Sequence, residues 1–150
     1  MGSFGPPSAG MHQPTTDRRR LPRPQRVLIV DDSEDIREMW RLWLTFWGFA
    51  VAEAGNGAEA VKMVRASLPD LVLMDLWMPV LDGLRATEQL KSDDATSAVP
   101  VLALSAQGGP YAESWAKAAG AEGFLHKPAA PDELLERMRE VFARCAARDS

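Results

Sequence analysis

The chain has 150 residues, 46% apolar and 25% charged, which predicts one globular domain with a substantial core. Its net charge of −4 is uneven, because residues 1–25 carry four arginines against one aspartate and leave −7 for the rest. An acidic body argues against general nucleic-acid binding and suits a site that holds a cation. With one cysteine, no signal peptide and no membrane-spanning run, the sequence predicts a soluble, cytoplasmic protein.

Residues 1–25 contain five prolines together with Gly, Ser and Thr, and they show no apolar periodicity. This composition predicts a disordered leader. The run Arg18–Arg20 is long enough to contact a phosphate or an acidic partner, although a solvated tail is the simpler interpretation. We expect the folded domain over residues 26–147 and a short tail at 148–150.

The domain begins with a strand pattern followed by a helix pattern. The apolar run Val27–Val30 predicts a buried strand, and Ser33 is a suitable N-cap for a helix that reaches about Trp47, where Gly48 provides the left-handed stop. The helix places its core-facing residues at helical spacing: Ile36, Trp40, Trp43, Leu44 and Trp47.

Leu42 and Phe46 lie off this apolar stripe. One interpretation is that they are partly covered surface residues, which single exposed apolar side chains usually are. The other is that they form a docking patch for a partner helix.

The next predicted elements are a strand over residues 49–54, a turn at 55–57 and a helix over 58–68. The inward residues of this helix are expected to be Ala60, Val61, Val64 and Leu68. An unbroken apolar run, Leu71–Met74, then ends abruptly in Asp75, which indicates a strand buried on both faces.

The second half repeats the alternation, beginning with a helix over about 83–91 and a polar surface loop over 92–97. Pro100 opens a strand over 101–104, because proline has no donor to give to a sheet. A helix from about residue 110 to Gly120 and a strand over 123–126 follow. The last helix, from 131 to about 146, turns its apolar residues inward: Leu134, Leu135, Met138, Val141 and Phe142.

Five strands alternating with five helices predict an α/β protein with a doubly wound parallel sheet, the flavodoxin-like fold. With strand order 2-1-3-4-5, the topological switch point lies between the first and third strands, where ligands bind at the carboxyl ends. Polar side chains follow four of the strands at this edge: Asp31, Asp32, Asp75, Ser105 and Lys127.

Three converging carboxylates need a cation, because two unit charges ~4 Å apart repel by about 4 kcal/mol at an effective dielectric near 20. Oxygen ligands favour Mg²⁺, with Mn²⁺ also possible, and no Cys or His pattern offers a zinc site. A carboxylate beside such a cation can attack a phosphoryl group and form an aspartyl phosphate. Lys127 would then supply a positive charge and Ser105 a hydroxyl donor.

Four segments in the expected order closely resemble the receiver domain of two-component response regulators, over about residues 26–146. They are Val30-Asp31-Asp32, Met74–Pro79 with Asp82-Gly83, Pro100–Ala106 and Phe124–Pro128. Each segment alone is a weak signal, but the four together at strand ends are specific.

The resemblance implies the composition of the metal and phosphoryl site. Asp75 matches the phosphoacceptor, and Asp31 and Asp32 match the acidic pair that binds Mg²⁺. The backbone carbonyl of Trp77 matches a further metal ligand. Such a domain is not a conventional enzyme, but it catalyses its own aspartate phosphorylation and a slow autodephosphorylation.

The resemblance also implies a switch. Ser105 matches the hydroxyl that swings to the phosphoryl group, and Phe124 matches the aromatic residue that moves inward on activation. Lys127 matches the phosphate-binding lysine, which is expected to precede a cis peptide at Pro128. In physical terms, one new charge biases an equilibrium between two states.

The implied partners are proteins, without a membrane or a direct nucleic-acid contact. A histidine kinase, a histidine phosphotransfer protein or a small phosphodonor would supply the phosphoryl group. His126 points away from Lys127 along its strand, and His12 lies in the leader, so the donor must be external. The output would appear on the fourth helix, fifth strand and fifth helix, toward a downstream protein, with a homodimer also possible.

Trp77 departs from the family's usual smaller or polar residue two positions after the phosphoacceptor. Together with Gln107 it flanks the path of the water that hydrolyses the acyl phosphate in family members. We hypothesise that the indole of Trp77 shields the phosphate and slows autodephosphorylation. The alternative is that Trp77 folds outward and serves recognition.

Other functions fit the residues less well. A haloacid dehalogenase-type phosphatase needs a second acid two residues after Asp75, where Trp77 stands. A flavin-mononucleotide carrier needs a Ser/Thr/Gly-rich phosphate loop, whereas acidic residues follow the first strand. A phosphorylation-independent interaction module remains the alternative. The sequence ends shortly after its last helix, which suits either a stand-alone receiver or a piece of a longer protein.

Overall fold

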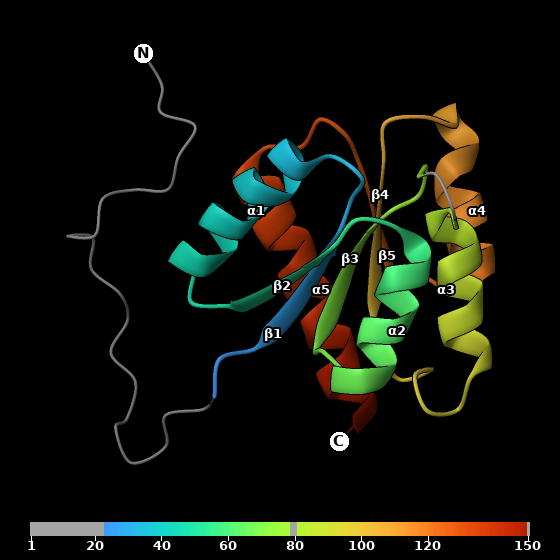
Figure 1. Cartoon of the computed structure of the whole chain (residues 1–150), viewed down its shortest axis with the longest axis horizontal. Coiled ribbons are helices and arrows are strands. Elements are labelled where there is room, and N and C mark those ends of the chain that lie inside the picture. Colours follow the sequence, from blue (N-terminus) through green and yellow to red (C-terminus); the bar gives the residue numbers. More distant parts are fainter. Residues whose placement is uncertain (1–22, 79–80, 150) are drawn as a thin grey trace.

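The computed structural model describes residues 23–78 and 81–149, so most of the predicted leader and Pro79 of the third-strand motif lie outside the described residues. Its centre is one parallel sheet with the order β2-β1-β3-β4-β5 (Figure 1). The strands are β1 (Arg26–Val30), β2 (Ala50–Ala54), β3 (Leu71–Asp75), β4 (Val101–Ser105) and β5 (Gly123–His126). The predicted doubly wound sheet and its strand order are confirmed.

Helices cover both faces of the sheet, as Figure 1 shows. They are α1 (Glu34–Phe46), α2 (Gly57–Ser67), α3 (Gly83–Ser92), α4 (Ala112–Ala119) and α5 (Pro131–Asp149), with a short 3₁₀ helix, η2 (Gly109–Tyr111), before α4. α1 and α5 pack on one face, whereas α2, α3 and α4 pack on the other. This is the arrangement that right-handed crossovers between parallel strands produce.

The central strand β3 is buried at all five positions, as the unbroken apolar run predicted. Its side chains alternate between the two core layers, with Leu71 and Leu73 toward α1 and α5, and Val72 and Met74 toward α2 and α3. Because both faces are packed, the strand has no solvent-facing side, and Asp75 is carried into the interior with it.

Side-chain caps set the starts of the helices beside the sheet edge. The Ser33 hydroxyl accepts a hydrogen bond from the backbone N–H of Ile36 at 3.3 Å, as expected for an N-cap. Asp82 does the same for α3 through the N–H of Arg85 at 2.8 Å. At the other end of α1, Gly48 has φ of +96°, so the predicted left-handed stop is confirmed.

Two expectations about side-chain burial were wrong. Leu68 was expected inward, but it caps α2 in the left-handed conformation with φ of 47°, which turns its side chain outward to 49% exposure. Thr96 was expected on a surface loop, but it is fully buried and donates its hydroxyl hydrogen to the Leu90 carbonyl at 2.7 Å. Local periodicity cannot reveal either a helix end that reverses or a loop tethered to its preceding helix.

Among the described helices, none combines the length and the apolar character needed to cross a bilayer. Of the two residues off the α1 stripe, Leu42 is exposed and Phe46 is half-buried.

Candidate functional site

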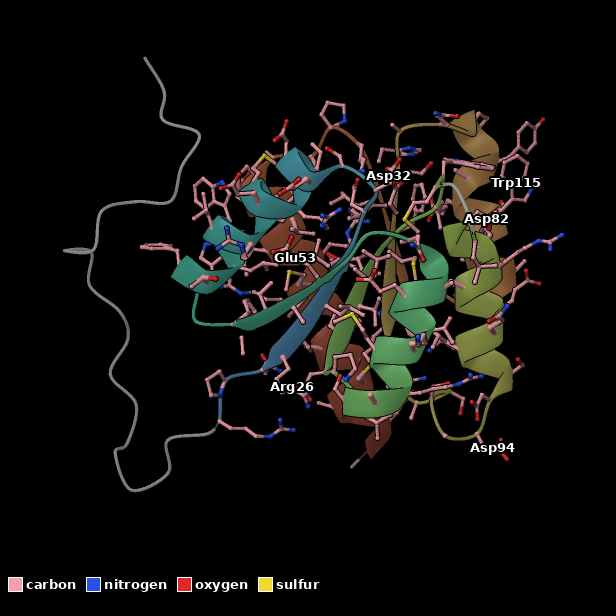
Figure 2. The ribbon with its side chains drawn as sticks, viewed as in Figure 1. Arg26, Asp32, Glu53, Asp82, Asp94 and Trp115 are labelled. Carbon is pink, nitrogen blue, oxygen red and sulfur yellow. The ribbon has the colours of Figure 1, made fainter. Side chains whose placement is uncertain are left out.

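Three carboxylates meet at the switch point of the sheet. Asp31 and Asp32 follow β1, and Asp75 ends β3, so the neighbouring strands deliver them to the same edge. One carboxylate oxygen from each residue lies within 4.8 Å of the others. Asp31 and Asp75 are 3% and 6% exposed, whereas Asp32 is exposed and is labelled at this end of the sheet in Figure 2.

Lys127 faces the same cluster from the end of β5. Its Nζ lies 2.5 Å from Asp31 Oδ2 and 3.7 Å from Asp75 Oδ2, and the side chain is 19% exposed. The peptide between Lys127 and Pro128 is cis, as the resemblance implied. The lysine therefore supplies one positive charge to three carboxylates, which leaves the cluster negative overall.

The pKa of Asp75 is raised from 3.8 to about 6. Burial is the largest cause, because it disfavours the charged form, and the negative charges of Asp31 and Asp32 act in the same direction. Lys127 and a 3.4 Å hydrogen bond from the Trp77 backbone N–H oppose this shift. The Asp75 carboxylate is thus mostly ionised at neutral pH, but its ionisation destabilises the folded protein. A nearby cation would reduce this destabilisation.

The donor set fits a hard divalent cation. It consists of carboxylate oxygens, two of them buried, with one exposed carboxylate on the open side. Asp31 is held in place by the Ser33 N–H, which donates to its Oδ1 at 2.9 Å. These residues form the cluster of possible metal-binding acidic groups found in the described part of the chain.

Arg37 supports the acidic turn and was missed by the sequence reasoning. One guanidinium N–H donates to the Asp31 carbonyl at 2.7 Å, and its Nε donates to Glu53 Oε1 on β2 at 3.1 Å. The arginine thereby ties β1, α1 and β2 together without contacting the Asp31 carboxylate. No sequence signal marks this role, because it depends on the packing of α1 beside β2.

Ser105 is buried at the end of β4, one strand from Asp75. Its hydroxyl donates to the Gln107 carbonyl at 2.5 Å and accepts hydrogen bonds from the Gln107 N–H at 3.1 Å and the Trp77 indole N–H at 2.9 Å. The Trp77 indole thus folds toward β4, while its ring is only half-buried. The shielding and recognition hypotheses for Trp77 both remain predictions.

Phe124 is 4% exposed and packs in a cluster with Leu76, Ala103, Ala112 and Ala116. Its ring lies edge-on to His126, with centroids 4.7 Å apart. The inward position that the resemblance associates with activation is therefore the one observed. His126 itself is exposed, which is consistent with its side chain lying outside the site.

Gly83 shapes the site through its missing side chain. A Cβ at this position would lie 2.1 Å from the Asp75 carbonyl oxygen, and the Gly83 N–H donates to the Leu76 carbonyl at 2.9 Å. The first turn of α3 therefore sits directly on the end of β3, which only glycine allows. The Asp82-Gly83 pair signalled the helix start but not this contact.

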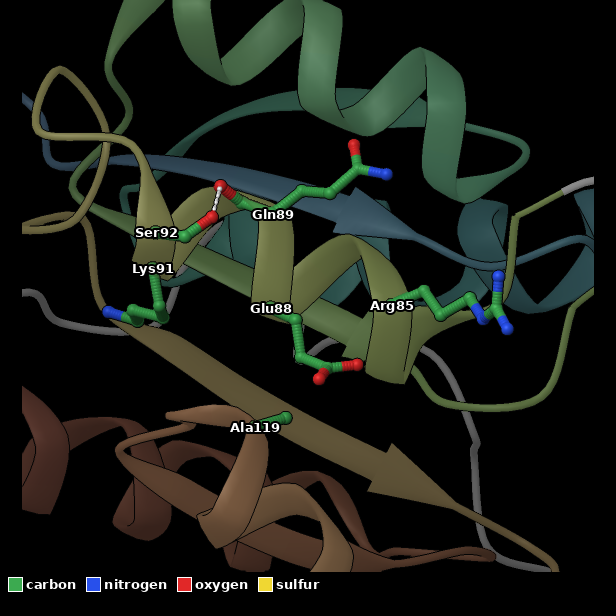
Figure 3. Close-up of a pocket in the computed structure, with 6 residues that line it drawn as sticks. All are labelled: Arg85, Glu88, Gln89, Lys91, Ser92 and Ala119. Atoms are coloured by element: carbon green, nitrogen blue, oxygen red, sulfur yellow. Dashed lines mark hydrogen bonds between the residues drawn. The ribbon is translucent and has the colours of Figure 1, made fainter.

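A separate depression of about 730 Å³ lies between α3 and α4. Figure 3 shows the residues that line it: Arg85, Glu88, Gln89, Lys91, Ser92 and Ala119. It shares no residue with the acidic cluster, and its lining mixes both charges. We therefore place the candidate site at the acidic cluster.

The parallel sheet and the acidic cluster at its edge are features of a known class of protein, and comparison with known sequences identifies that class. The sequence matches the response regulator receiver domain over residues 27–139. The chain belongs to this family, so it is a receiver domain of the response regulators of two-component signalling.

Individual relatives agree with this assignment. The chain is 40% identical over 128 residues to response regulator MprA of Mycolicibacterium vanbaalenii, a match that covers 84% of this chain and 54% of that protein. A second MprA, from a Mycobacterium species (strain KMS), is 41% identical over 123 residues, covering 81% and 52%. The chain thus spans about half the length of the curated relatives it matches.

Solved structures show the same fold. A putative response regulator from Chloroflexus aurantiacus is 35% identical with a TM-score of 0.76, covering 80% of this chain and 98% of that one. Chemotaxis protein CheY4 of Vibrio cholerae is 32% identical with a TM-score of 0.74, covering 79% and 98%. Both relatives are similar across nearly their whole length.

Proposed function

We propose that the domain accepts a phosphoryl group on Asp75 and thereby switches a protein-interaction surface. The donor is a phosphohistidine on a histidine kinase or a histidine phosphotransfer protein, with small phosphodonors as substitutes. The observation that carries the proposal is the convergence of Asp31, Asp32 and Asp75 on one edge with Lys127 beside them. We also infer that the protein acts in the cytoplasm, where such kinases present their phosphohistidine.

The chemical step is a displacement at phosphorus. A carboxylate oxygen of Asp75 forms the new P–O bond, the P–N bond to the donor imidazole breaks, and its electron pair leaves with the imidazole. Lys127 would neutralise charge on the transferred group, because its Nζ lies 3.7 Å from Asp75 Oδ2. Asp31, Asp32, Asp75 and the Trp77 backbone carbonyl would hold Mg²⁺, or Mn²⁺, which supplies further charge neutralisation.

The switch would involve Ser105 and Phe124. The Ser105 hydroxyl sits at the end of the strand next to β3, so it can donate to a phosphoryl oxygen on Asp75 once it leaves the Gln107 carbonyl. Phe124 is already buried beside α4, so in this protein the change would start at Ser105. The surface of α4, β5 and α5 would present the result to a downstream protein.

Acetyl phosphate with Mg²⁺ tests the proposal. Wild-type protein should gain the mass of one phosphoryl group, and Asp75→Asn should abolish the gain. Asp70→Asn is a matched control, because Asp70 immediately precedes β3 at the end opposite to Asp75, where its carboxylate accepts the Arg26 backbone N–H at 2.7 Å. Absence of any mass gain, with no response to beryllofluoride, would instead support a phosphorylation-independent interaction module.

Trp77 and Gln107 are proposed to modulate hydrolysis of the acyl phosphate. Replacing Trp77 by asparagine removes the indole and should shorten the lifetime of the phosphorylated protein severalfold. Loss of label from the phosphorylated protein over time, with Gln107→Ala measured in parallel, provides the comparison. An unchanged or longer lifetime in Trp77→Asn would show that the indole does not shield the phosphate.

A further inference from the structure

The Ser105 hydroxyl is saturated in the resting state. It has one hydrogen, which it donates to the Gln107 carbonyl, and it accepts from two N–H groups, those of Gln107 and of the Trp77 indole. A hydroxyl of this kind is free to serve a phosphoryl group on Asp75 only after these bonds rearrange. Trp77 is therefore a direct partner of the group that would have to move.

Trp77 also begins a chain of aromatic contacts that ends on the surface. Its ring meets Trp115 edge-on, with centroids 6.0 Å apart and planes at 82°. Trp115 in turn stacks on Tyr111, with centroids 6.1 Å apart. Trp115 is 43% exposed and Tyr111 65% exposed, and Figure 2 labels Trp115 on α4, at the same end of the molecule as Asp32.

The loop that follows Ser105 also lies close to Trp115. Gly108 has φ of +94°, and a Cβ there would lie 3.2 Å from the Trp115 ring. A shift of Ser105 toward Asp75 therefore disturbs Trp115 from two sides, through the Trp77 ring and through the backbone at Gly108. Edge-to-face pairs hold a defined geometry, so such a shift changes the position of the Trp115 ring.

We propose that Trp77 is a latch, whose indole N–H holds Ser105 in its resting position and whose release is transmitted through Trp115 to the exposed surface of α4. This inference rests on the proposed phosphorylation of Asp75. When Ser105 donates to the phosphoryl group, its oxygen moves away from the indole N–H, and that bond is lost. The bond thus favours the resting state, and Trp77 is a positioning residue for the switch hydroxyl.

The size of the effect follows from the worth of one hydrogen bond. The typical net contribution of one hydrogen bond would change the equilibrium constant between the resting and switched states by a factor of roughly 2 to 10. A ligand that binds the switched state gains affinity by the same factor when the resting state is weakened. Replacing Trp77 by phenylalanine keeps an aromatic ring beside Trp115 and removes the N–H, so it isolates this bond.

The first arm of the test follows each tryptophan by fluorine NMR on the full-length chain labelled with 5-fluorotryptophan. Addition of Mg²⁺ and beryllofluoride should shift the resonances of Trp77 and Trp115. Trp43 and Trp47 are internal references, because they pack against each other at the C-terminal end of α1, with ring centroids 5.6 Å apart, on the other face of the sheet. In Ser105→Ala, which lacks the hydroxyl donor, beryllofluoride should bind more weakly, and at a saturating concentration the Trp115 shift should be lost.

The second arm is a double-mutant cycle read by beryllofluoride affinity. Trp77→Phe should bind roughly 2 to 10 times more tightly than wild type, and it should have no effect in the Ser105→Ala background. If Trp77→Phe disturbs the Trp43 and Trp47 resonances, its fold has changed and the Ser105→Ala arm decides alone.

The outcomes separate the two proposals. Failure of wild-type protein to bind beryllofluoride would overturn the phosphorylation of Asp75. Binding with an unmoved Trp115 resonance, or a Trp77→Phe effect that persists without the Ser105 hydroxyl, would overturn the latch and leave the phosphorylation intact.

Discussion

Asp75 is the proposed nucleophile, and its ionised form lowers the stability of the folded protein. Its pKa of about 6, raised from 3.8, means that the folded protein holds this proton more tightly than the unfolded chain does. The stability contributed by this group is therefore fully present below about pH 4 and is lost as the pH rises through about 6. A phosphoacceptor buried among like charges is tolerated because the rest of the fold outweighs this loss.

Asp75→Asn should accordingly stabilise the metal-free domain at about pH 7.5, by up to about 3 kcal/mol, because two pKa units correspond to that free energy. The gain should nearly vanish at about pH 3, below the ordinary pKa of 3.8, where the wild-type carboxyl is mostly protonated in both the folded and the unfolded state. Urea unfolding with a chelator at the two pH values measures it. Asp94→Asn, which removes the same charge from an exposed loop, is the control and should show no such pH dependence.

The backbone of the site leaves no room for a side chain at Gly83. Gly83→Ala should destabilise the domain by roughly 1–3 kcal/mol or more and reduce phosphorylation by acetyl phosphate, because its Cβ would collide with the Asp75 carbonyl. Gly55→Ala is a matched control, since its nearest neighbour is the Arg37 side chain at 3.6 Å. Thermal unfolding and phosphoryl incorporation report the two effects, and equal behaviour of the two variants would contradict the assigned contact.

At the scale of the elements, helical periodicity predicted burial correctly within a helix and failed at a helix end. The stripe on α1 was confirmed in that Trp40 and Leu44 are buried, because a regular helix repeats its direction every 3.6 residues. Leu68 broke the pattern because its backbone had already left the helix. The residue at a helix end follows the conformation of the cap rather than the period of the helix.

Leu68 therefore lowers the free energy of unfolding, because a leucine at this helix end must adopt the left-handed conformation. Leu68→Gly should raise the free energy of unfolding by about 1 kcal/mol, because glycine adopts the left-handed conformation without strain and little burial is lost. Ser67→Gly, one residue earlier and within α2, should lower it by about the same amount. Chemical denaturation of both variants gives the comparison, and a loss of stability in Leu68→Gly would contradict it.

At the scale of the whole molecule, the acidic site depends on strands that are far apart in the chain. Asp31 and Lys127 are 96 residues apart, yet they form an ion pair across the sheet edge. The described residues, 23–78 and 81–149, contain the five-stranded sheet and the helices on both of its faces. We propose that residues 26–147 are the folding unit, as the composition predicted.

Removal of residues 1–22 should therefore leave the melting temperature and the extent of phosphorylation unchanged. The remaining chain keeps the Gln25 carbonyl, which accepts the Ala50 N–H at 2.9 Å, and Arg23, which pairs with Asp70 at 3.7 Å. Differential scanning calorimetry and the acetyl phosphate assay check both expectations. A drop in melting temperature of several degrees would mean that the leader contributes to the fold.

The sequence by itself determined the five-stranded parallel sheet, its order and the grouping of Asp31, Asp32, Asp75 and Lys127. The strands follow from local apolar runs, and their order is that of the doubly wound fold which the alternation of strands and helices predicts. The grouping follows from the rule that the carboxyl ends of parallel strands meet at one edge. Only the tertiary structure decided that Trp77 bonds to Ser105, that Arg37 braces the acidic turn and that Leu68 faces outward. These contacts depend on how loops and helix ends pack against distant elements, and a short window of sequence carries no record of that packing.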